Sequence, residues 1–144
     1  ATVANGGTRY KTTLLNKIMN YELTDTVYVN SPIVAQETGI SVSVLDIVKG
    51  GMLSVTEEGT ARAYFADYPI KVGGKTGTAQ NNGPDHSVFV AFAPFDDPEI
   101  ALCVVFENGE TSRTTGAVAK QILDKYFYSS FEEYDDEAAD TLLP

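Results

Sequence analysis

Cysteine, histidine and tryptophan are nearly missing from this chain of 144 residues, and their scarcity excludes several kinds of site. There is one cysteine, Cys103, one histidine, His86, and no tryptophan. A single cysteine permits neither an intrachain disulfide nor a cysteine-based metal site. A Ser-His-Asp triad or a multi-histidine zinc site would have to be built around His86 alone. Because Cys103 lies in an apolar run, residues 100–106, we expect its side chain to be buried.

Basic residues are also few, which argues against nucleic acid as a partner. The chain has 10 Lys and Arg against 20 Asp and Glu, a formal net charge of -10. Six of the acids lie in residues 131–144, where there is no Lys or Arg. No basic stripe of the kind that binds nucleic acid is present. We expect residues 131–144 to form a solvated, flexible acidic tail and residues 1–130 to form the folded part.

Long apolar runs are absent as well. No stretch of about 18 apolar residues occurs, and no signal peptide is visible. Apolar residues still make up 43% of the chain, enough for a packed core in one domain or in part of a larger one. The opening residues 1–7, Ala-Thr-Val-Ala-Asn-Gly-Gly, are typical of the last turn of a helix before a glycine stop. We therefore expect the chain to be a fragment of a longer protein.

The remaining sequence predicts helices at two places. Apolar residues recur at helical spacing in residues 41–55 and again in residues 115–128. Ser43 is predicted to cap the first of these helices, with Asp46 in its first turn. Gly50-Gly51 is predicted to bend or divide it, because glycine is a poor helix former.

Strands are predicted on both sides of the first helix. Upstream, residues 12–18 and 27–29 have strand character. Downstream, a strand containing residues 75–80 and the apolar runs 87–93 and 100–106 are separated by turns, which predicts an antiparallel meander of three strands. The fold class is therefore predicted to be α+β, an antiparallel sheet of at least three strands packed with helices.

The segment Lys75-Thr76-Gly77-Thr78, called the KTGT motif below, is the strongest chemical signal. It begins a predicted edge strand, follows Gly73-Gly74 and has a hairpin partner behind it. Lysine supplies a point charge with three donors, the two threonines supply hydroxyls, and glycine lets another backbone approach the strand. Lys-Thr-Gly is among the signatures of penicillin-binding proteins and serine β-lactamases.

Several further blocks appear in the order found in one family. They are Ala-Asn-Gly-Gly-Thr-Arg-Tyr-Lys (4–11), Gly-Thr-Ala (59–61), Val-Gly-Gly-Lys-Thr-Gly-Thr-Ala-Gln (72–80), Asp-His (85–86), Phe-Val-Ala-Phe-Ala-Pro (89–94), Pro-Glu-Ile-Ala-Leu-Cys-Val-Val-Phe-Glu-Asn-Gly (98–109) and Gln-Ile-Leu-Asp-Lys-Tyr-Phe (121–127). Over about residues 1–128 the chain resembles the C-terminal part of the transpeptidase domain of class B penicillin-binding proteins, of the elongation type and similar to penicillin-binding protein 2.

That resemblance implies a role for each residue of the KTGT motif. Lys75 and Thr78 are expected to be catalytic: Lys75 polarises a serine of a second motif, and the Thr78 backbone N–H is the second donor of the oxyanion hole. Thr76 and Thr78 are expected to bind the terminal carboxylate of the substrate. Gly77 is expected to let the substrate backbone pair with the strand. The resemblance implies no cofactor and no metal.

The resemblance also implies partners and a location. The substrate would be the D-Ala-D-Ala end of a peptidoglycan stem peptide, and β-lactams would bind in its place. The other partner would be the N-terminal remainder of the same protein, which would anchor it in the cell membrane with this part outside the cytoplasm. The activity would be cross-linking of the cell wall, which makes such a protein an antibiotic target.

Two motifs of that family are missing from this chain. The family nucleophile is the serine of Ser-x-x-Lys, and a second serine lies in Ser-x-Asn; none of the eight serines here has Lys three residues later or Asn two residues later. Thr8-Arg9-Tyr10-Lys11 matches only formally, because it follows a glycine helix stop instead of opening a helix. We therefore predict that the chain alone cannot form an acyl-enzyme.

Other interpretations remain open on sequence grounds. The chain could be a non-catalytic module that binds a partner or serves as a scaffold. A serine β-lactamase or D,D-carboxypeptidase would share Lys-Thr-Gly, although the blocks after it favour the transpeptidase. His86 could line the cleft, but a histidine that hydrogen-bonds the adjacent loop is the favoured interpretation.

Overall fold

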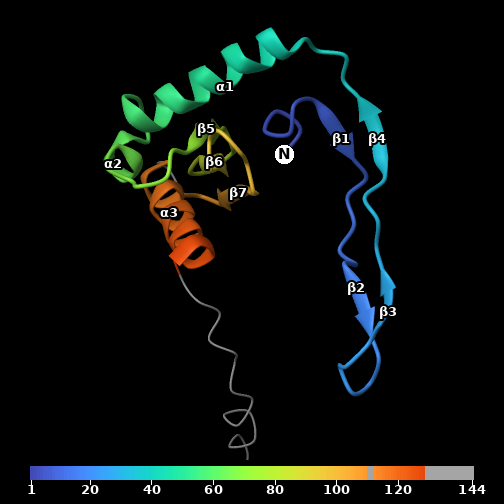
Figure 1. Ribbon diagram of the computed structural model, residues 1–144. Coiled ribbons are helices and arrows are strands. Elements are labelled where there is room, and N and C mark those ends of the chain that lie inside the picture. The colour runs from blue at the N-terminus through green and yellow to red at the C-terminus, as the bar shows by residue number, and fades with distance from the viewer. Residues whose placement is uncertain (110–111, 129–144) are drawn as a thin grey trace, which may run out of the picture.

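The computed structural model describes residues 1–109 and 112–128 of the chain. The predicted acidic tail, residues 131–144, lies outside the described residues. The fold of the described part is α+β, as predicted, with antiparallel strands and helices packed on them. Figure 1 shows a body that holds the larger sheet and the helices, and beside it a long arm of paired strands.

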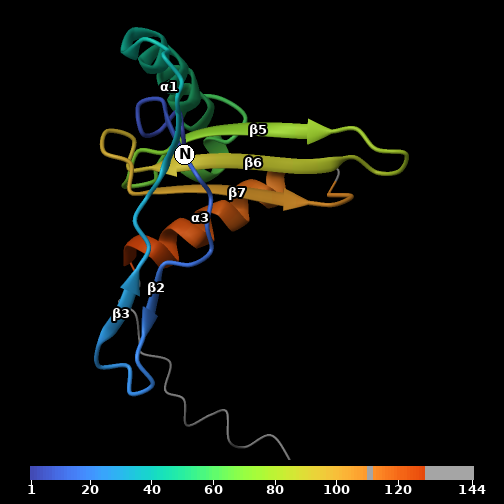
Figure 2. The same cartoon turned by 90° about the vertical axis from the view of Figure 1, so that its right-hand side faces the viewer.

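The larger sheet is the predicted three-stranded meander. Its order is β5 (Gly73–Ala79), β6 (His86–Ala93) and β7 (Ile100–Phe106), each pair antiparallel and without a register shift. The three strands lie side by side in Figure 2, with β5 at one edge. The KTGT motif therefore lies on an edge strand, where sequence reasoning expected it.

One face of this sheet carries the core. Helix α3 (Ser112–Tyr128) packs on it through side chains such as Leu123, which is fully buried. The short helix α2 (Arg62–Phe65) adds Phe65, whose ring stacks on the buried Phe89 ring with 5.7 Å between centroids. Because side chains alternate along a strand, only every second residue of β6 and β7 faces this core.

The alternation explains why the prediction for Cys103 is wrong. Cys103 is exposed, although it lies in an apolar run. It pairs with Val90, which pairs with Lys75, so these three side chains share the face opposite α3. Its neighbour Val104 faces α3 and is buried. The apolar run has no alternation that would distinguish its two faces, and so it did not reveal which one is covered.

The helix predicted at residues 41–55 is α1 (Val42–Glu57), and three details of the prediction are wrong. Its N-cap is Ser41, without a side-chain capping hydrogen bond, and no acidic residue lies in its first turn. The helix also runs without interruption through Gly50-Gly51. Glycine costs a helix only about 1 kcal/mol, and the packing of this helix against β5 offsets that cost.

The C-terminal end of α1 is fastened to the strand that follows. Thr56 is buried, and its hydroxyl lies 2.5 Å from the carbonyl oxygen of Val72 and 2.8 Å from that of Leu53. Val72 directly precedes β5. A buried hydroxyl with these partners ties the position of α1 to the start of the KTGT strand.

The arm contains the remaining strands. β1 (Thr8–Tyr10) pairs with β4 (Val34–Glu37), and β2 (Lys17–Met19) pairs with β3 (Thr26–Val29), all antiparallel. The two ladders follow one another along the arm in Figure 1.

The strand predicted at residues 12–18 is therefore wrong over most of its length. The backbone N–H of Leu15 donates to the Thr13 hydroxyl at 3.2 Å, a local turn that competes with strand pairing. The strand predicted at residues 27–29 is confirmed within β3 (Thr26–Val29). The opening residues do form a turn that ends at glycine, as predicted, since Gly6 has φ 83° and the Gly7 N–H donates to the Thr2 carbonyl at 2.8 Å.

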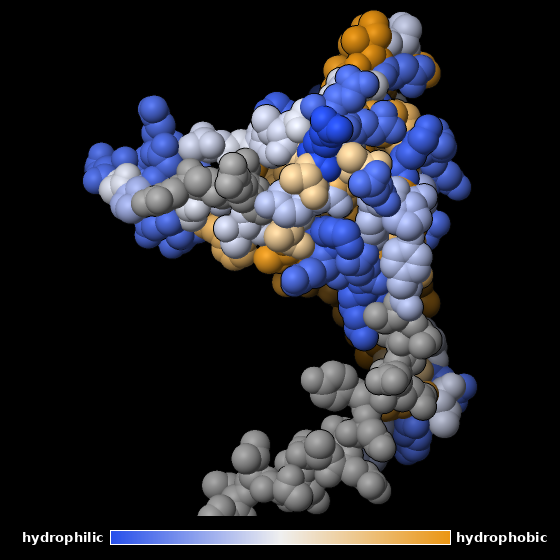
Figure 3. All heavy atoms as spheres, turned by 90° about the vertical axis from the view of Figure 1, so that its left-hand side faces the viewer, coloured by the Kyte–Doolittle hydropathy of each residue, from blue (hydrophilic) through white to orange (hydrophobic). Residues whose placement is uncertain are grey.

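Apolar surface is concentrated on the arm and on the outer side of α1. Leu14, Tyr21 and Leu23 of the arm are 105%, 97% and 70% exposed, and Ile47 of α1 is 75% exposed. The opposite side of the molecule, over α2 and α3, is mainly hydrophilic, and the β5–β6 turn projects from it as a hydrophilic tip (Figure 3). Within residues 1–109 and 112–128, no helix has the length and apolar character needed to cross a membrane.

Candidate active site

The KTGT motif occupies the middle of the edge strand β5. β6 pairs with β5 on one side, and no other strand of the described chain pairs with it. Lys75 and Thr78 are exposed, and Thr76 and Gly77 are partly buried. The four residues predicted as a site therefore lie together on a strand with an open edge, to which another extended peptide could pair.

The glycines in and next to the motif differ in whether packing within the chain requires them. A Cβ at Gly73 would lie 2.4 Å from the Phe92 ring, and one at Gly74 would lie 2.7 Å from the Phe89 ring. Packing inside the chain thus demands glycine at both positions. A Cβ at Gly77 would instead meet only Val88, with its nearest atom at 3.6 Å, an ordinary van der Waals contact. Nothing in the described packing requires glycine at position 77.

The side chains of the motif alternate between the two faces of the sheet. Thr76 and Thr78 are two residues apart and share the face toward α2 and α3, while Lys75 lies on the opposite face. The Lys75 ammonium donates to the Thr76 carbonyl oxygen at 2.5 Å. The motif can thus offer one positive charge and two hydroxyls to a ligand that lies along the edge of β5.

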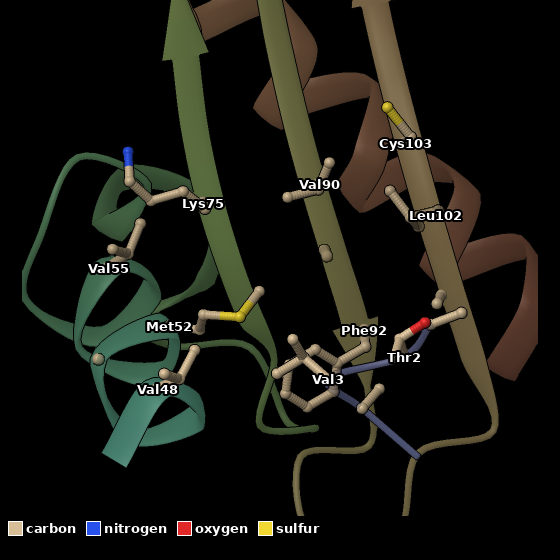
Figure 4. Close-up of a pocket in the computed structure, with 15 residues that line it drawn as sticks. Thr2, Val3, Val48, Met52, Val55, Lys75, Val90, Phe92, Leu102 and Cys103 are labelled. Atoms are coloured by element: carbon tan, nitrogen blue, oxygen red, sulfur yellow. The ribbon is translucent and has the colours of Figure 1, made fainter. Parts of the chain in front are cut away.

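Lys75 also lies beside a cavity of about 880 Å³ on the face of the sheet away from α3. The rest of the lining is largely apolar, with Val48, Met52 and Val55 from α1 and Phe92 from β6. Figure 4 shows these α1 side chains pointing toward the sheet, with Lys75 near one end of the group. On this face α1 contributes part of the cavity wall, and Lys75 and Cys103 of the sheet remain exposed there.

A residue that no sequence argument singled out touches the motif. The Thr60 hydroxyl lies 2.8 Å from the Thr76 hydroxyl, and either oxygen can be the donor. Thr60 belongs to the connection between α1 and α2, 16 residues before Thr76. Gly59-Thr60-Ala61 is one of the blocks that resemble the family, but a threonine in a turn gives no sign of the strand against which it will fold.

His86 is not among the residues that line the cavity beside Lys75. It begins β6 opposite Ala79, and its Nδ1 accepts a hydrogen bond from the backbone N–H of Asn108 at 2.9 Å. Asn108 has a left-handed backbone with φ 56°, as a tight turn requires. The favoured interpretation, a histidine that holds the neighbouring loop, is confirmed.

Among the described residues, the two ionisable groups with clearly shifted pKa values lie on or beside α3. Burial and the nearby Asp124 carboxylate raise the pKa of Tyr68 well above its ordinary value. The hydrogen bond and ion pair from Lys120, with Nζ 2.8 Å from Asp124, lower the pKa of Asp124. Both groups belong to the packing of α3 and neither reaches the KTGT motif. In the part of the chain that the structure describes, no three His, Cys, Asp or Glu side chains come together as a metal site requires.

Comparison with known proteins identifies the family of the chain. Residues 1–128 match the family described as the penicillin binding protein transpeptidase domain. The chain therefore belongs to this family, and the resemblance to class B penicillin-binding proteins is confirmed. The α+β fold built around the edge strand β5 is the fold of such domains.

Three known proteins illustrate the similarity. The peptidoglycan D,D-transpeptidase MrdA of Escherichia coli K12 is 35% identical over 55% of this chain and 15% of its own length. The structure of penicillin-binding protein 2B from Streptococcus pneumoniae R6 has a TM-score of 0.74, 28% identity, and coverage of 90% of this chain and 24% of that one. The ceftriaxone acyl-enzyme complex of penicillin-binding protein A from Mycobacterium tuberculosis has a TM-score of 0.66, 26% identity, and coverage of 84% and 28%. The chain thus spans less than a third of each of these proteins.

Proposed function

We propose that this chain supplies the substrate-binding edge of a serine-type peptidoglycan D,D-transpeptidase. The observation that carries the proposal is Gly77: it lies on an open strand edge, and no neighbour among residues 1–109 and 112–128 requires it to be glycine. A glycine that packing does not require is explained if a ligand backbone approaches the strand there. The KTGT motif then binds an extended peptide as an added strand.

Each residue of the motif has a part in this proposal. The hydroxyls of Thr76 and Thr78 bind the carboxylate at the D-Ala-D-Ala terminus, or the carboxylate of a β-lactam. The Thr78 backbone N–H donates to the oxyanion that develops on the attacked carbonyl, an interaction typically worth about 2.7–4 kcal/mol in the transition state. Lys75 adds positive charge on the side of the sheet where the serine motifs are expected to pack.

The nucleophile must come from outside these 144 residues, because no serine here stands in a Ser-x-x-Lys or Ser-x-Asn sequence. In the reaction, a serine hydroxyl from the N-terminal remainder of the protein attacks the carbonyl between the two D-Ala residues. The terminal D-Ala takes up a proton and leaves as the free amino acid. An amine of a second stem peptide then attacks the resulting ester and releases the serine. This chain alone is proposed to be inactive.

The same proposal gives the chain its setting. The partner is the N-terminal remainder of the protein, which carries the serine motifs and a membrane anchor, and the domain acts outside the cytoplasm. The exposed apolar surface of α1 and the cavity between α1 and the sheet are consistent with a missing partner surface. The relative from Mycobacterium tuberculosis, which forms an acyl-enzyme with ceftriaxone, supports β-lactams as ligands here.

The experiment compares two lysine variants of the intact protein, that is, this chain joined to its remainder. Lys75→Met removes the charge on β5, and Lys71→Met removes an exposed charge four residues earlier, outside the strand. Loss of a charged hydrogen bond costs about 1.5–3 kcal/mol, so the rate of labelling by a fluorescent penicillin should fall about 10- to 150-fold in Lys75→Met. Lys71→Met should label like the natural protein. Equal labelling of both variants would mean that Lys75 takes no part in acylation, and would favour the alternative in which this chain is a non-catalytic scaffold.

A further inference from the structure

Thr60, which lies between α1 and α2, contacts a side chain of β5, the strand that is proposed to bind the substrate carboxylate. Its hydroxyl oxygen lies 2.8 Å from that of Thr76, on the face of β5 that Thr76 shares with Thr78. Thr60 is itself exposed, so burial alone does not dictate a hydroxyl at this position. The pair joins the connection after α1 directly to the side chain that is proposed to hold the substrate carboxylate.

The backbone around Thr60 is held in place independently of this contact. The Gly59 N–H donates to the Ser54 carbonyl at 2.8 Å, and the Ala61 N–H donates to the Val55 carbonyl at 3.0 Å. A Cβ at Gly59 would lie 2.8 Å from the Cα of Val55, so the turn is closed too tightly for any other residue. Together with the Thr56 hydroxyl on the Val72 carbonyl, these bonds fix the approach of the connection to β5.

The direction of the hydrogen bond between the hydroxyls decides what Thr76 can do. A hydroxyl has one proton and two acceptor lone pairs. When Thr60 donates to Thr76, the Thr76 proton remains free to donate to a carboxylate, and the first bond polarises the second. When Thr76 donates to Thr60, its proton points away from the ligand and only lone pairs face the anion. An anionic ligand therefore selects the first arrangement.

We infer that Thr60 is a positioning residue that orients the Thr76 hydroxyl toward the carboxylate of the ligand. This inference rests on the proposed function, because it requires that Thr76 bind a carboxylate. The simpler interpretation is that the two hydroxyls only fasten the connection to the strand. Fastening would affect the stability of the fold and the binding of every ligand alike, whereas orientation of a donor affects only ligands that carry the anion.

The experiment uses penicillin G and its methyl ester, which lacks the anionic carboxylate. For the intact protein, the dissociation constant of the complex before acylation and the acylation rate constant are measured separately, by competition against a fluorescent penicillin. Thr60→Val removes the hydroxyl at nearly constant volume, and Thr60→Ser keeps it. In Thr60→Val the dissociation constant for penicillin G should rise about threefold to tenfold, as for loss of one hydrogen bond. The value for the ester and the melting temperature should not change, and Thr60→Ser should restore binding.

Two further variants separate the possible failures. Thr76→Val should weaken the binding of penicillin G but not the binding of the ester. If it weakens the binding of both ligands equally, or of neither, the proposed role of Thr76 in binding the carboxylate is wrong. If Thr76→Val discriminates between the ligands and Thr60→Val does not, only the role of Thr60 is wrong. The double variant should bind penicillin G as Thr76→Val does, because Thr60 acts only through Thr76. Additive effects, or equal weakening of both ligands by Thr60→Val, would overturn the inference.

Discussion

Gly74 and Gly77 lie on the same strand, yet their replacement by alanine should have opposite consequences. A Cβ at Gly74 would lie 2.7 Å from the Phe89 ring and 3.0 Å from Cγ2 of Thr56. Phe89 has no exposed surface and stacks on Phe65, so its ring has no space into which to turn. Overpacking of this kind typically costs about 1–3 kcal/mol of folding free energy. Gly74→Ala should therefore lower the melting temperature of the intact protein.

Gly77→Ala should leave that melting temperature nearly unchanged. Its Cβ would lie 3.6 Å from the Cβ of Val88, so the fold gains an ordinary contact and no clash. The same methyl group would obstruct the edge along which the ligand is proposed to pair. Since a displacement of about 1 Å at a reacting group can cost about 100-fold in rate, we expect labelling by a fluorescent penicillin to slow by about that factor.

The assay is a pair of measurements on each variant: the melting temperature and the second-order rate constant of penicillin labelling. Gly74→Ala should lose stability, and its labelling should follow the fraction that remains folded. Gly77→Ala should have a much lower rate constant of labelling and an unchanged melting temperature. The reasoning would be refuted if Gly77→Ala labelled at the natural rate, or if it lost as much stability as Gly74→Ala.

Two further predictions concern stability. Thr56→Val should lower the free energy of unfolding of the intact protein by about 1–3 kcal/mol in urea denaturation, because the buried Val72 carbonyl loses its hydroxyl partner; no loss would contradict the proposed fastening of α1 to β5. Tyr68 has its pKa raised by burial, so the folded protein holds this proton more tightly than the unfolded chain. The stability that results from this tighter proton binding is fully present below about pH 10 and is lost as the pH rises further. Tyr68→Phe removes the ionisable phenol and should therefore make the decline of the melting temperature above about pH 10 less steep.

The sheet and its motif could be predicted from the sequence because the signals there are local. Turn residues separate β5, β6 and β7, and the KTGT motif with its preceding glycines marks the edge strand. The class of the fold follows from the same region. The arm could not be predicted as well: β4 is short and mostly exposed, and a pattern of buried and exposed residues does not arise where neither face is covered.

The contacts between segments that lie far apart in the chain could not be predicted from the sequence. Cys103 is exposed because β7 presents one face to α3 and the other to the open cavity, a difference that depends on where α3 packs. Thr60 contacts Thr76 because a glycine turn brings the end of α1 beside β5. Neither residue type reveals its neighbours, since an apolar run and a turn threonine fit many tertiary arrangements.

The location of the covalent penicillin adduct tests the central claim most directly. The intact protein is labelled with a penicillin, digested, and the modified peptide is identified by mass spectrometry, with the isolated chain treated in parallel. We predict that the adduct lies on a serine outside residues 1–144, that the isolated chain carries no label, and that Gly77→Ala slows formation of the adduct. A stable adduct on any serine within this chain, or an intact protein that no penicillin labels, would contradict the proposal that β5 serves a nucleophile supplied by the remainder.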